Sequence, residues 1–490
     1  MEKIIDLGNF EGKVVVRFAP NPSGYLHIGH ARAAILNDEI AKEYNGKLIL
    51  RIEDTDPSRV DIESYEAIEE DLKWLNIKWH EKIIQSSRLE IYEKFAKQLI
   101  EEGNAYLCNC DTEKFKNLKL KHQICVHRNL SIKENLENFE KMKYEDGWVV
   151  RVKTSPGLQN TSLIDFPILR TSRIQHPLLK NKDQRIYPLM NFSVTIDDHL
   201  LGITHVLRGK DHLINTEKQK FLYKFFNWEP PKFIHYGMMN IQNEGKISKS
   251  EIKKGIEEKI YTGWDDVRLL TLRALKRRGI NPAAIREYII SIGIKDADIS
   301  FSEEILYSMN KKYVEKSKRY FFVDNPVKLI VENFPNLILD MPLHKDYDYG
   351  YRHYEINPKN GRVTFFIRKE DSENIKVGEE IRLMNLCNVK ILKIDNEIYG
   401  NYVNDSHSPM AKVNGKIGEH KKYYKCKKIL WILDEHFLKA KVFSPERNYE
   451  GYCEIHCKNL KEDDIIQFEG FGFCRVDKIN DEIEFCFGHR

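Results

Sequence analysis

The first hundred residues alternate between two patterns of apolar positions. Short, almost uniformly apolar runs at 14–18 and 47–52 are typical of strands buried on both faces. Over about 31–44, 63–75 and 88–102, apolar residues recur every three to four positions, which predicts amphipathic helices. Strands that alternate with helices predict a parallel sheet covered by helices, and therefore an α/β fold of the Rossmann type.

The pattern changes several times further along the chain. A Lys/Glu-rich segment with cysteines and short strands interrupts the first pattern, which then resumes. Helical periodicity follows, and short strands separated by turn residues fill the last part, as is typical of β-barrels. We expect a Rossmann-type domain of residues 1–105 and 185–255, an inserted domain of 106–184, a helical domain of 256–335 and a β-barrel region of 336–490.

The composition is that of a water-soluble chain. Of 490 residues, 41% are hydrophobic and 31% are charged, without an apolar run long enough to span a membrane. The first residues lack the features of a secretory leader, and nine unevenly spaced cysteines favour reduced thiols. We therefore expect a cytoplasmic monomer without membrane contact. Because the net charge is only +4, any RNA contact must come from local basic surface.

A first motif, His27-Ile28-Gly29-His30, follows the first strand and a turn that contains two prolines, an asparagine and a glycine. It lies where the first helix begins, and the unpaired N–H groups of a helix start favour an anion. Gly29 lets a flat ligand approach the backbone. We expect His27 and His30 to share a helix face from which both donate to phosphate oxygens.

A second motif, Lys246-Ile247-Ser248-Lys249-Ser250, lies in a stretch that is typical of a loop. Its ammonium and hydroxyl groups can close on a triphosphate and stabilise charge as pyrophosphate leaves. Taken alone, the first motif is an ordinary histidine pair and the second a solvated basic turn. Together, at the expected ends of an α/β unit, they predict a protein that binds ATP and transfers its adenylate.

The sequence around the first motif resembles a known family. Residues 17–24, 27–30 and 50–56 closely resemble class I glutamyl-tRNA synthetases of the archaeal and eukaryotic type, and 381–386 and 466–473 resemble the paired barrels that these enzymes share with glutaminyl-tRNA synthetases. The resemblance covers nearly the whole chain. It implies an aminoacyl-tRNA synthetase that charges tRNA-Glu with L-glutamate, using ATP and Mg²⁺. It also implies that the inserted domain binds the acceptor stem, the helical domain the tRNA stem and the barrels the anticodon.

The reaction implied has two steps. The α-carboxylate of glutamate attacks the α-phosphorus of ATP and releases diphosphate, and a ribose hydroxyl of tRNA then takes the acyl group and releases AMP. Neither step needs a protein nucleophile, so positioning and electrostatics carry catalysis. We predict that His27, His30, Lys246 and Lys249 are catalytic, and that ATP is bound by His27, Gly29, His30, Lys246, Ser248, Lys249 and Ser250.

The resemblance also implies the amino-acid site, with contacts from Arg17, Ala19, Glu53, Tyr187, Asn191 and Arg208. Arg17 ends a strand and offers a rigid fork for a carboxylate, while Glu53 can take the ammonium. Tyr187 and Asn191, four positions apart, are expected to share a face. Arg208 is expected to select the γ-carboxylate, because glutaminyl enzymes have a small uncharged residue there. The ordinary alternative for Arg208 is a surface salt bridge.

Four soft ligands stand in two pairs, Cys108-x-Cys110 and Cys125-x-His127. One interpretation is a structural Zn²⁺ site in the inserted domain. The other is buried thiols beside an unrelated histidine, because these spacings are tighter than the usual Cys-x-x-Cys.

Contacts with tRNA are predicted for Lys276, Arg277, Arg278 and Arg352. The first three follow an amphipathic run and could touch phosphates, although a basic helix end also suits the helix dipole. Arg352 lies in the barrel region, where aromatic residues near Tyr423 and the lysine-rich segment 421–428 could also contact unstacked bases.

Several alternatives remain open at this point. They are a synthetase that also charges tRNA-Gln, a glutamine–tRNA ligase, a small-molecule nucleotidyltransferase and a non-catalytic tRNA-binding paralogue. Arg208 disfavours the glutamine enzyme, the barrels disfavour a small second substrate, and the two intact motifs disfavour a non-catalytic protein.

Overall fold

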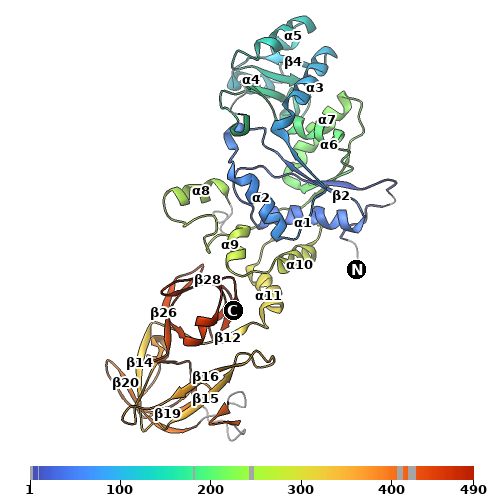
Figure 1. Cartoon of the computed structure of the whole chain (residues 1–490). Helices are drawn as coiled ribbons and strands as arrows, with labels where there is room; N and C mark the ends of the chain where they lie inside the picture. The colour runs from blue at the N-terminus through green and yellow to red at the C-terminus, as the bar shows by residue number, and fades with distance from the viewer. Residues whose placement is uncertain (1–3, 9, 180–182, 242–247, 406–411, 418–425) are drawn as a thin grey trace. The chain divides into compact units, whose positions relative to one another are not determined.

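The computed structural model describes residues 4–8, 10–179, 183–241, 248–405, 412–417 and 426–490 (Figure 1). Contacts divide the chain into two compact units. The first comprises residues 1–260 and 285–302, and the second comprises 261–284 and 303–490.

A parallel sheet forms the centre of the first unit. The strands β1 (Val15–Phe18), β2 (Lys47–Ile52) and β3 (Glu81–Ile84) pair in parallel, and so do β8 (His205–Gly209) and β9 (Lys232–Tyr236). The backbone N–H of Thr204 donates to the carbonyl of Val15 (2.9 Å), which joins β8 to the free edge of β1. The strand order is therefore β3-β2-β1-β8-β9, and the predicted Rossmann-type fold, interrupted and then resumed, is confirmed.

Helices cover this sheet, and α1 packs against β1 and β2 (Figure 1). The helices of this part are α1 (Ile28–Glu43), α2 (Glu63–Trp74), α3 (Leu89–Glu101), α6 (Met190–Leu200) and α7 (Leu213–Phe225). The first of them begins three residues earlier than the periodicity predicts. The reason is that the side chain of His27 caps its N-terminus, a role that histidine rarely fills and that apolar periodicity cannot reveal.

The insertion after β3 and α3 is a small antiparallel sheet with its own helices (cyan and teal in Figure 1). Its elements are β4 (Ala105–Cys108), α4 (Thr112–Leu120), α5 (Ile132–Lys141), β5 (Val149–Val152), β6 (Pro167–Thr171) and β7 (Ile186–Pro188). Its apolar side chains share one core with α3 and α6, which includes Tyr92, Val150 and Phe192. The remaining elements that belong wholly to this unit are β10 (Met239–Asn240), α8 (Lys249–Glu257) and β11 (Ile299–Ser300), while α10 (Pro282–Ile292) spans the division between the units.

The second unit begins with short helices, α9 (Leu272–Arg277) and α11 (Glu303–Val314), and continues as strands. The strands are β12 (Lys318–Tyr320), β13 (Phe322–Asp324), β14 (Pro326–Glu332), β15 (Leu337–Pro342), β16 (Tyr351–Ile356), β17 (Val363–Arg368), β18 (Glu380–Leu383), β19 (Cys387–Ile394), β20 (Ile398–Asp405), β21 (Lys412–Val413), β22 (Lys416–Ile417), β23 (Lys427–Ile429), β24 (Ile432–Leu433), β25 (Phe437–Phe443), β26 (Tyr449–Glu454), β27 (Ile465–Phe468), β28 (Gly472–Ile479) and β29 (Ile483–His489), with a single turn of helix at α12 (Lys369–Ser372).

The strands β16-β15-β21-β22 form a four-stranded sheet, and the others form two barrel-like sheets. The apolar side chains gather in two cores. One barrel-like sheet has the order β12-β27-β28-β29-β25-β26-β13, and the other has the order β23-β18-β19-β20-β14-β17-β24. Strands begin at Lys318, within the segment whose periodicity suggested helices. The reason is that β12 and β13 are only three residues long and pair with β27 and β26, so no local pattern marks them.

Among the residues with described positions, no helix is both long enough and apolar enough to cross a membrane.

Arg352, predicted to contact tRNA, is instead a buried member of the second unit. Its side chain is 1% exposed, and it donates to Glu454 Oε1 (2.6 Å), Glu469 Oε1 (3.3 Å) and the carbonyl of Pro342 (3.3 Å). Glu454 also accepts from the hydroxyl of Tyr354 (2.7 Å). The guanidinium therefore joins the four-stranded sheet, through β16, to the seven-stranded sheet that contains β26, and it is not available to RNA.

Replacing Arg352 by Ala should leave Glu454 buried without its cation. We expect a loss of about 3–5 kcal/mol in the free energy of unfolding of the second unit, measured by guanidinium denaturation. Arg362→Ala is the matched control, because that guanidinium is 62% exposed and pairs with Glu332 (2.6 Å). It should cost at most about 1 kcal/mol. Equal losses in the two variants would contradict the role assigned to Arg352.

Candidate active site

A cavity of about 680 Å³ opens at the carboxyl ends of β1, β2 and β8. This is the position at which the strand order reverses, where parallel α/β sheets commonly bind ligands. Both halves of the interrupted sheet contribute to it. Of the residues predicted from the sequence, it is lined by Arg17, Ala19, His27, Gly29, His30, Glu53 and Arg208.

The two histidines of the first motif lie against each other, with ring centroids 3.8 Å apart. Nδ1 of His27 accepts the backbone N–H of Gly29 (3.1 Å), and Nδ1 of His30 accepts the backbone N–H of His27 (3.3 Å). Since each Nδ1 is an acceptor, each neutral ring carries its proton on Nε2. A Cβ at Gly29 would lie 2.9 Å from the ring of His27, so the glycine also leaves room for this ring.

Both imidazoles are neutral near pH 7. Burial, followed by the charge of Lys249, lowers the pKa of His27 to about 3. Burial, and then His27 and Lys249, also lower the pKa of His30 well below its usual value. Each ring can offer one Nε2–H to a phosphate oxygen. The prediction that both rings share a helix face is wrong, because His27 is the N-cap and has an extended backbone.

Lys249 connects the second motif to the turn that precedes the first motif. Its Nζ donates to the carbonyls of Asn21 (3.3 Å) and Gly24 (3.0 Å), in the turn between β1 and α1. Burial, followed by the charge of Arg59, lowers the pKa of Lys249 to about 8. The hydroxyls of Ser248 and Ser250 lie 3.3 Å apart, and neither residue lines the cavity. Lys246 lies outside the described residues.

Arg17 and Glu53 are held by a buried network that sequence reasoning missed. Asp198 accepts from Nε of Arg17 (3.3 Å) and from Nη1 of Arg51 (2.6 Å), and Nη2 of Arg51 donates to Glu53 (3.0 Å). The side chains of Arg51 and Asp198 are 0% and 1% exposed. Burial disfavours ionised Asp198, but Arg51 and Arg17 hold its pKa below its usual value. Burial raises the pKa of Glu53 despite both arginines, so an additional cation would stabilise its charge.

Arg208 is buried, and among the described residues no carboxylate pairs with it. It is 8% exposed, its Nη2 donates to the hydroxyl of Thr216 and to Oε1 of Gln219 (2.9 Å), and its Nε has no hydrogen-bond partner among the described residues. Burial, followed by repulsion from Arg17, lowers its pKa to about 10. The alternative of a surface salt bridge does not hold for the described part of the chain. Neutral groups orient this guanidinium and leave its charge free for an anion.

Tyr187 and Asn191 do not line the cavity. Tyr187 lies in β7, buried in the core shared with the insertion, and its hydroxyl donates to the carbonyl of Gln184 (3.3 Å). Asn191 lies in α6, so the expectation that the two share a face is wrong. The amide of Asn191 accepts from Nε2 of Gln219 (3.2 Å), whose other end binds Arg208, so Asn191 supports Arg208 indirectly.

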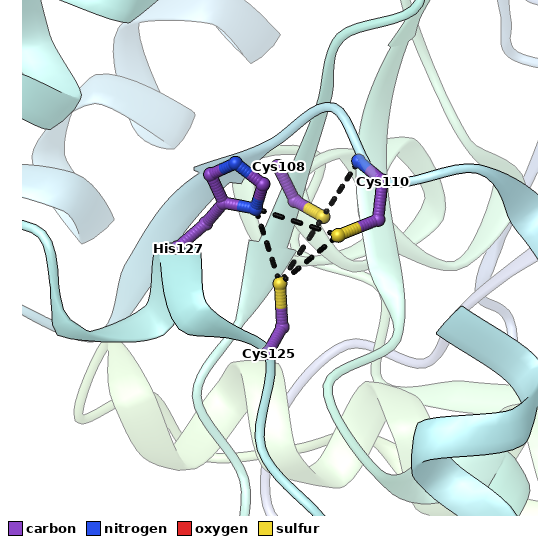
Figure 2. Close-up of side chains that lie close together, drawn as sticks. All are labelled: Cys108, Cys110, Cys125 and His127. Carbon is purple, nitrogen blue, oxygen red and sulfur yellow. Dashed lines mark hydrogen bonds between the residues drawn. The ribbon is translucent and has the colours of Figure 1, made fainter. Parts of the chain in front are cut away.

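The four predicted metal ligands come together in the insertion (Figure 2). Their ligand atoms all lie within 4.8 Å of one another. Sγ of Cys125 is 3.3 Å from Sγ of Cys110, 3.8 Å from Sγ of Cys108 and 3.2 Å from Nδ1 of His127. Three sulfurs and one nitrogen converging on one point match a tetrahedral zinc site. The alternative of an unrelated histidine is therefore disfavoured.

Of the three basic residues near the end of α9, two are engaged within the second unit. Nη2 of Arg277 donates to Asp477 (2.7 Å), and Arg278, 3% exposed, donates to the carbonyl of Gly488 (2.9 Å). Lys276 is exposed. Lys276 is thus accessible to a phosphate of tRNA, whereas the two arginines bind partners within the protein.

Two residues of the network carried a signal in the sequence. Arg51 is a charge inside the apolar run 47–52, and Asp198 follows a second aspartate in a largely apolar helix. Charged residues within otherwise apolar segments indicate an internal ion pair, but the sequence alone does not show that these two residues are partners.

The fold and this site define a class I aminoacyl-tRNA synthetase, and comparison with known proteins agrees. Residues 13–316 match the catalytic domain of "tRNA synthetases class I (E and Q)", and 317–407 and 428–477 match anticodon-binding domains of the same family. The chain belongs to this family of glutamyl and glutaminyl (E and Q) synthetases.

Archaeal proteins are similar to it over nearly its whole length. It is 47% identical to the glutamate–tRNA ligase of Methanocaldococcus jannaschii, over 100% of this chain and 86% of that protein. It is 45% identical to the glutamate–tRNA ligase of Methanococcus maripaludis strain C7, over 99% of this chain and 84% of that protein.

Replacing Asp198 by Asn should remove the charge that holds Arg17 and balances Arg51. We expect the KM for the amino acid to rise about 10- to 100-fold, because hydrogen bonds to charged groups contribute about 1.5–3 kcal/mol. The KM for ATP should change little. Aminoacylation kinetics with each substrate varied in turn measure both constants.

Asp197→Asn is the matched control. Asp197 is equally buried, and two of its partners, Arg88 (2.9 Å) and Tyr92 (2.7 Å), do not line the cavity. Its third partner, Gln85 (2.8 Å), does line the cavity but is not one of the residues predicted to contact the amino acid. This variant should lose stability while its KM for the amino acid stays within about threefold of the wild-type value. The same increase in KM in both variants would show that Asp198 has no special role in the site.

Proposed function

We propose that the chain is a glutamate–tRNA ligase, which activates L-glutamate with ATP and transfers it to the 3′ end of tRNA-Glu. The observation that carries this proposal is Arg208, a buried guanidinium in the cavity without a carboxylate partner in the described structure. The relatives named above are also glutamate–tRNA ligases.

The charges of the cavity complement those of glutamate. The substrate brings one ammonium and two carboxylates. Glu53, whose pKa burial raises, would take the ammonium, and Arg17, with its Nε tied to Asp198, would present its free fork to the α-carboxylate. Arg208 would take the γ-carboxylate, with Ala19 leaving space in the cavity wall. A glutamine amide in the same place would leave Arg208 without a counter-charge, a penalty of several kcal/mol.

The two motifs would bind and activate ATP. Nε2–H groups of His27 and His30 can donate to phosphate oxygens, and Lys249 adds a positive charge beside them. We propose that Lys246, Ser248 and Ser250, which belong to the same motif, also bind the triphosphate. Mg²⁺ would enter with the nucleotide and neutralise phosphate charge.

In the first step, an oxygen of the glutamate α-carboxylate bonds to the α-phosphorus and diphosphate leaves. In the second, the terminal ribose hydroxyl of tRNA bonds to the acyl carbon and AMP leaves. The chain's own groups hold the reactants in line and stabilise the charge that develops on the phosphate.

We also propose that Cys108, Cys110, Cys125 and His127 bind one structural Zn²⁺. The cluster joins the end of β4 to the segment between α4 and α5, which lie 15 or more residues apart in sequence. Zinc would fix this junction, because bonds to thiolates and imidazole stabilise short segments that lack a large core.

The amino-acid specificity is tested at Arg208. The wild-type enzyme should charge tRNA-Glu with glutamate and not with glutamine, in aminoacylation and in pyrophosphate exchange with and without tRNA. Arg208→Gln should lower kcat/KM for glutamate by about 100- to 5,000-fold, since breaking a buried charge pair costs about 3–5 kcal/mol. Parallel assays with tRNA-Glu and tRNA-Gln show whether the enzyme charges both.

Lys210→Gln serves as the control for this substitution. Lys210 lies two residues further along and pairs with Asp298 (2.7 Å), with 39% of its side chain exposed. Its loss should leave glutamate kinetics nearly unchanged. A wild-type enzyme that activates glutamine as well as glutamate would overturn the assignment.

Metal analysis of the purified protein tests the zinc site. We expect about one equivalent of zinc, and clearly less in Cys125→Ser, because a four-ligand site that loses a thiolate binds weakly. Cys426→Ser removes a partly exposed cysteine outside the cluster and should keep the full equivalent. Zinc well below one equivalent in the wild-type protein would refute the site.

A further inference from the structure

A buried histidine of the insertion contacts the segment that carries Glu53. His176 lies between β6 and β7, and its side chain is 0% exposed. Its Nε2 lies 2.9 Å from the backbone carbonyl of Asp54, which follows Glu53 and stands 122 positions earlier in the chain. A buried polar contact between such distant segments fixes one against the other.

The direction of this hydrogen bond follows from the other ring nitrogen. Nδ1 of His176 accepts the backbone N–H of Leu178 (3.2 Å), so the ring carries its proton on Nε2. The Nε2–H therefore donates to the carbonyl of Asp54, and Nε2 also lies 3.5 Å from Oδ2 of the same residue. Because both residues are buried, water cannot readily replace this donor if it is lost.

The carboxylate of Asp54 ties the same point to two further elements. Its Oδ2 accepts from the hydroxyl of Tyr65 in α2 (2.6 Å), and its Oδ1 accepts from the backbone N–H of Ser86, just after β3 (2.7 Å). Burial disfavours the ionised carboxylate, but hydrogen bonds from His176, Tyr65 and Ser86 hold its pKa below its usual value. Asp54 is therefore a rigid point, and His176 attaches the insertion to it.

The position of Glu53 depends on this point because the sheet ends just before it. Strand β2 pairs with β3 up to Ile52, where the ladder of backbone hydrogen bonds stops. The backbone of Glu53 is held by the turn before α1, through the carbonyl of Pro20 (3.0 Å) and the side-chain amide of Asn21 (2.8 Å). His176 supplies the corresponding support one residue further on.

A second link from the insertion to this segment is weaker. Arg170 of β6 pairs with Asp56 (2.9 Å), but the two side chains are 39% and 32% exposed. Exposed ion pairs contribute little to stability and are screened by salt. The buried hydrogen bond of His176 is therefore the stronger constraint on the segment.

We infer that His176 is a positioning residue for the amino-acid site, because its hydrogen bond to Asp54 holds Glu53 where the carboxylate meets the substrate ammonium. The inference rests on the role proposed above for Glu53. His176 does not line the cavity and so acts through its neighbour. A carboxylate that is oriented before the amino acid arrives lowers the cost of binding it.

Two substitutions at this position separate the bond to Asp54 from the other contacts of the ring. In His176→Gln, the amide N–H reaches the place of Nε2–H and keeps a donor for Asp54. In His176→Asn, the shorter amide keeps the contact with Leu178 but does not reach Asp54. We expect His176→Asn to raise the KM for glutamate about five- to tenfold, as the loss of a buried hydrogen bond does, with the KM for ATP within about twofold of the wild-type value. His176→Gln should recover most of this loss.

The loss should also depend on Glu53. Glu53→Gln alone should weaken glutamate binding, and adding His176→Asn to it should cause little further increase in KM, because the group that the histidine positions is already altered. Fully additive losses would overturn the inference, since His176 would then act elsewhere.

His122→Asn is the matched control. His122 is an exposed histidine of the same insertion, and its Nδ1 also contacts a backbone carbonyl, that of Pro156 (2.9 Å). The KM values for glutamate and ATP should both stay at the wild-type level in this variant.

Hydrogen exchange gives a readout that needs no activity. The amides of residues 53–55 should exchange faster in His176→Asn than in His176→Gln, while the amides of β5 exchange alike in both. Equal exchange at 53–55 with equal KM values overturns the inference, and so does faster exchange throughout β5, which would make the histidine a support of the insertion as a whole. A wild-type protein that fails to activate glutamate would instead overturn the proposed function and leave the exchange difference in place.

Discussion

The site depends on one buried carboxylate, that of Asp198, which lies between Arg17 and Arg51. With Glu53 it completes a row of alternating charges, contributed by β1, α6 and the end of β2. Each member would be costly to bury alone, so the row is stable only when all members are in place. Because α6 follows the insertion and the two strands precede it, the same row joins the two halves of the interrupted sheet. It also orients Arg17 and Glu53, the two groups proposed to bind the substrate.

Arg208 differs from this row in an instructive way. Arg51, which is also buried, pairs with two carboxylates, whereas Arg208 is held by the neutral side chains of Thr216 and Gln219. Neutral acceptors fix the direction of a guanidinium without cancelling its charge. A site for an anionic side chain requires one buried cation whose charge is not balanced by the protein, as at Arg208, while the charges around it, such as that of Arg51, are balanced.

Local signals in the sequence predicted much of the fold and part of the site. The strands β1 and β2, the two motifs and the cluster of three cysteines and a histidine each lie within a stretch whose local pattern marks it. Arg352 shows where this reasoning failed. Its partner Glu454 is 102 residues away. The local sequence around an arginine in a strand is the same whether the side chain contacts RNA or a buried carboxylate. The strands β12 and β13 were missed for the same reason, since their partners lie more than 120 residues further along the chain.

The electrostatics of the nucleotide site follow from burial. Two protonated histidines beside Lys249 would place three positive charges together in a partly closed space, at a large cost in free energy. Because burial lowers the pKa of His27 to about 3, the rings stay neutral and act as donors, and positive charge is left to the lysine. With a pKa of about 8, Lys249 is mostly protonated near pH 7 without a ligand, and a bound triphosphate would raise that pKa. Nucleotide binding above pH 8 is therefore coupled to proton uptake at this lysine, while the histidines take no part in it.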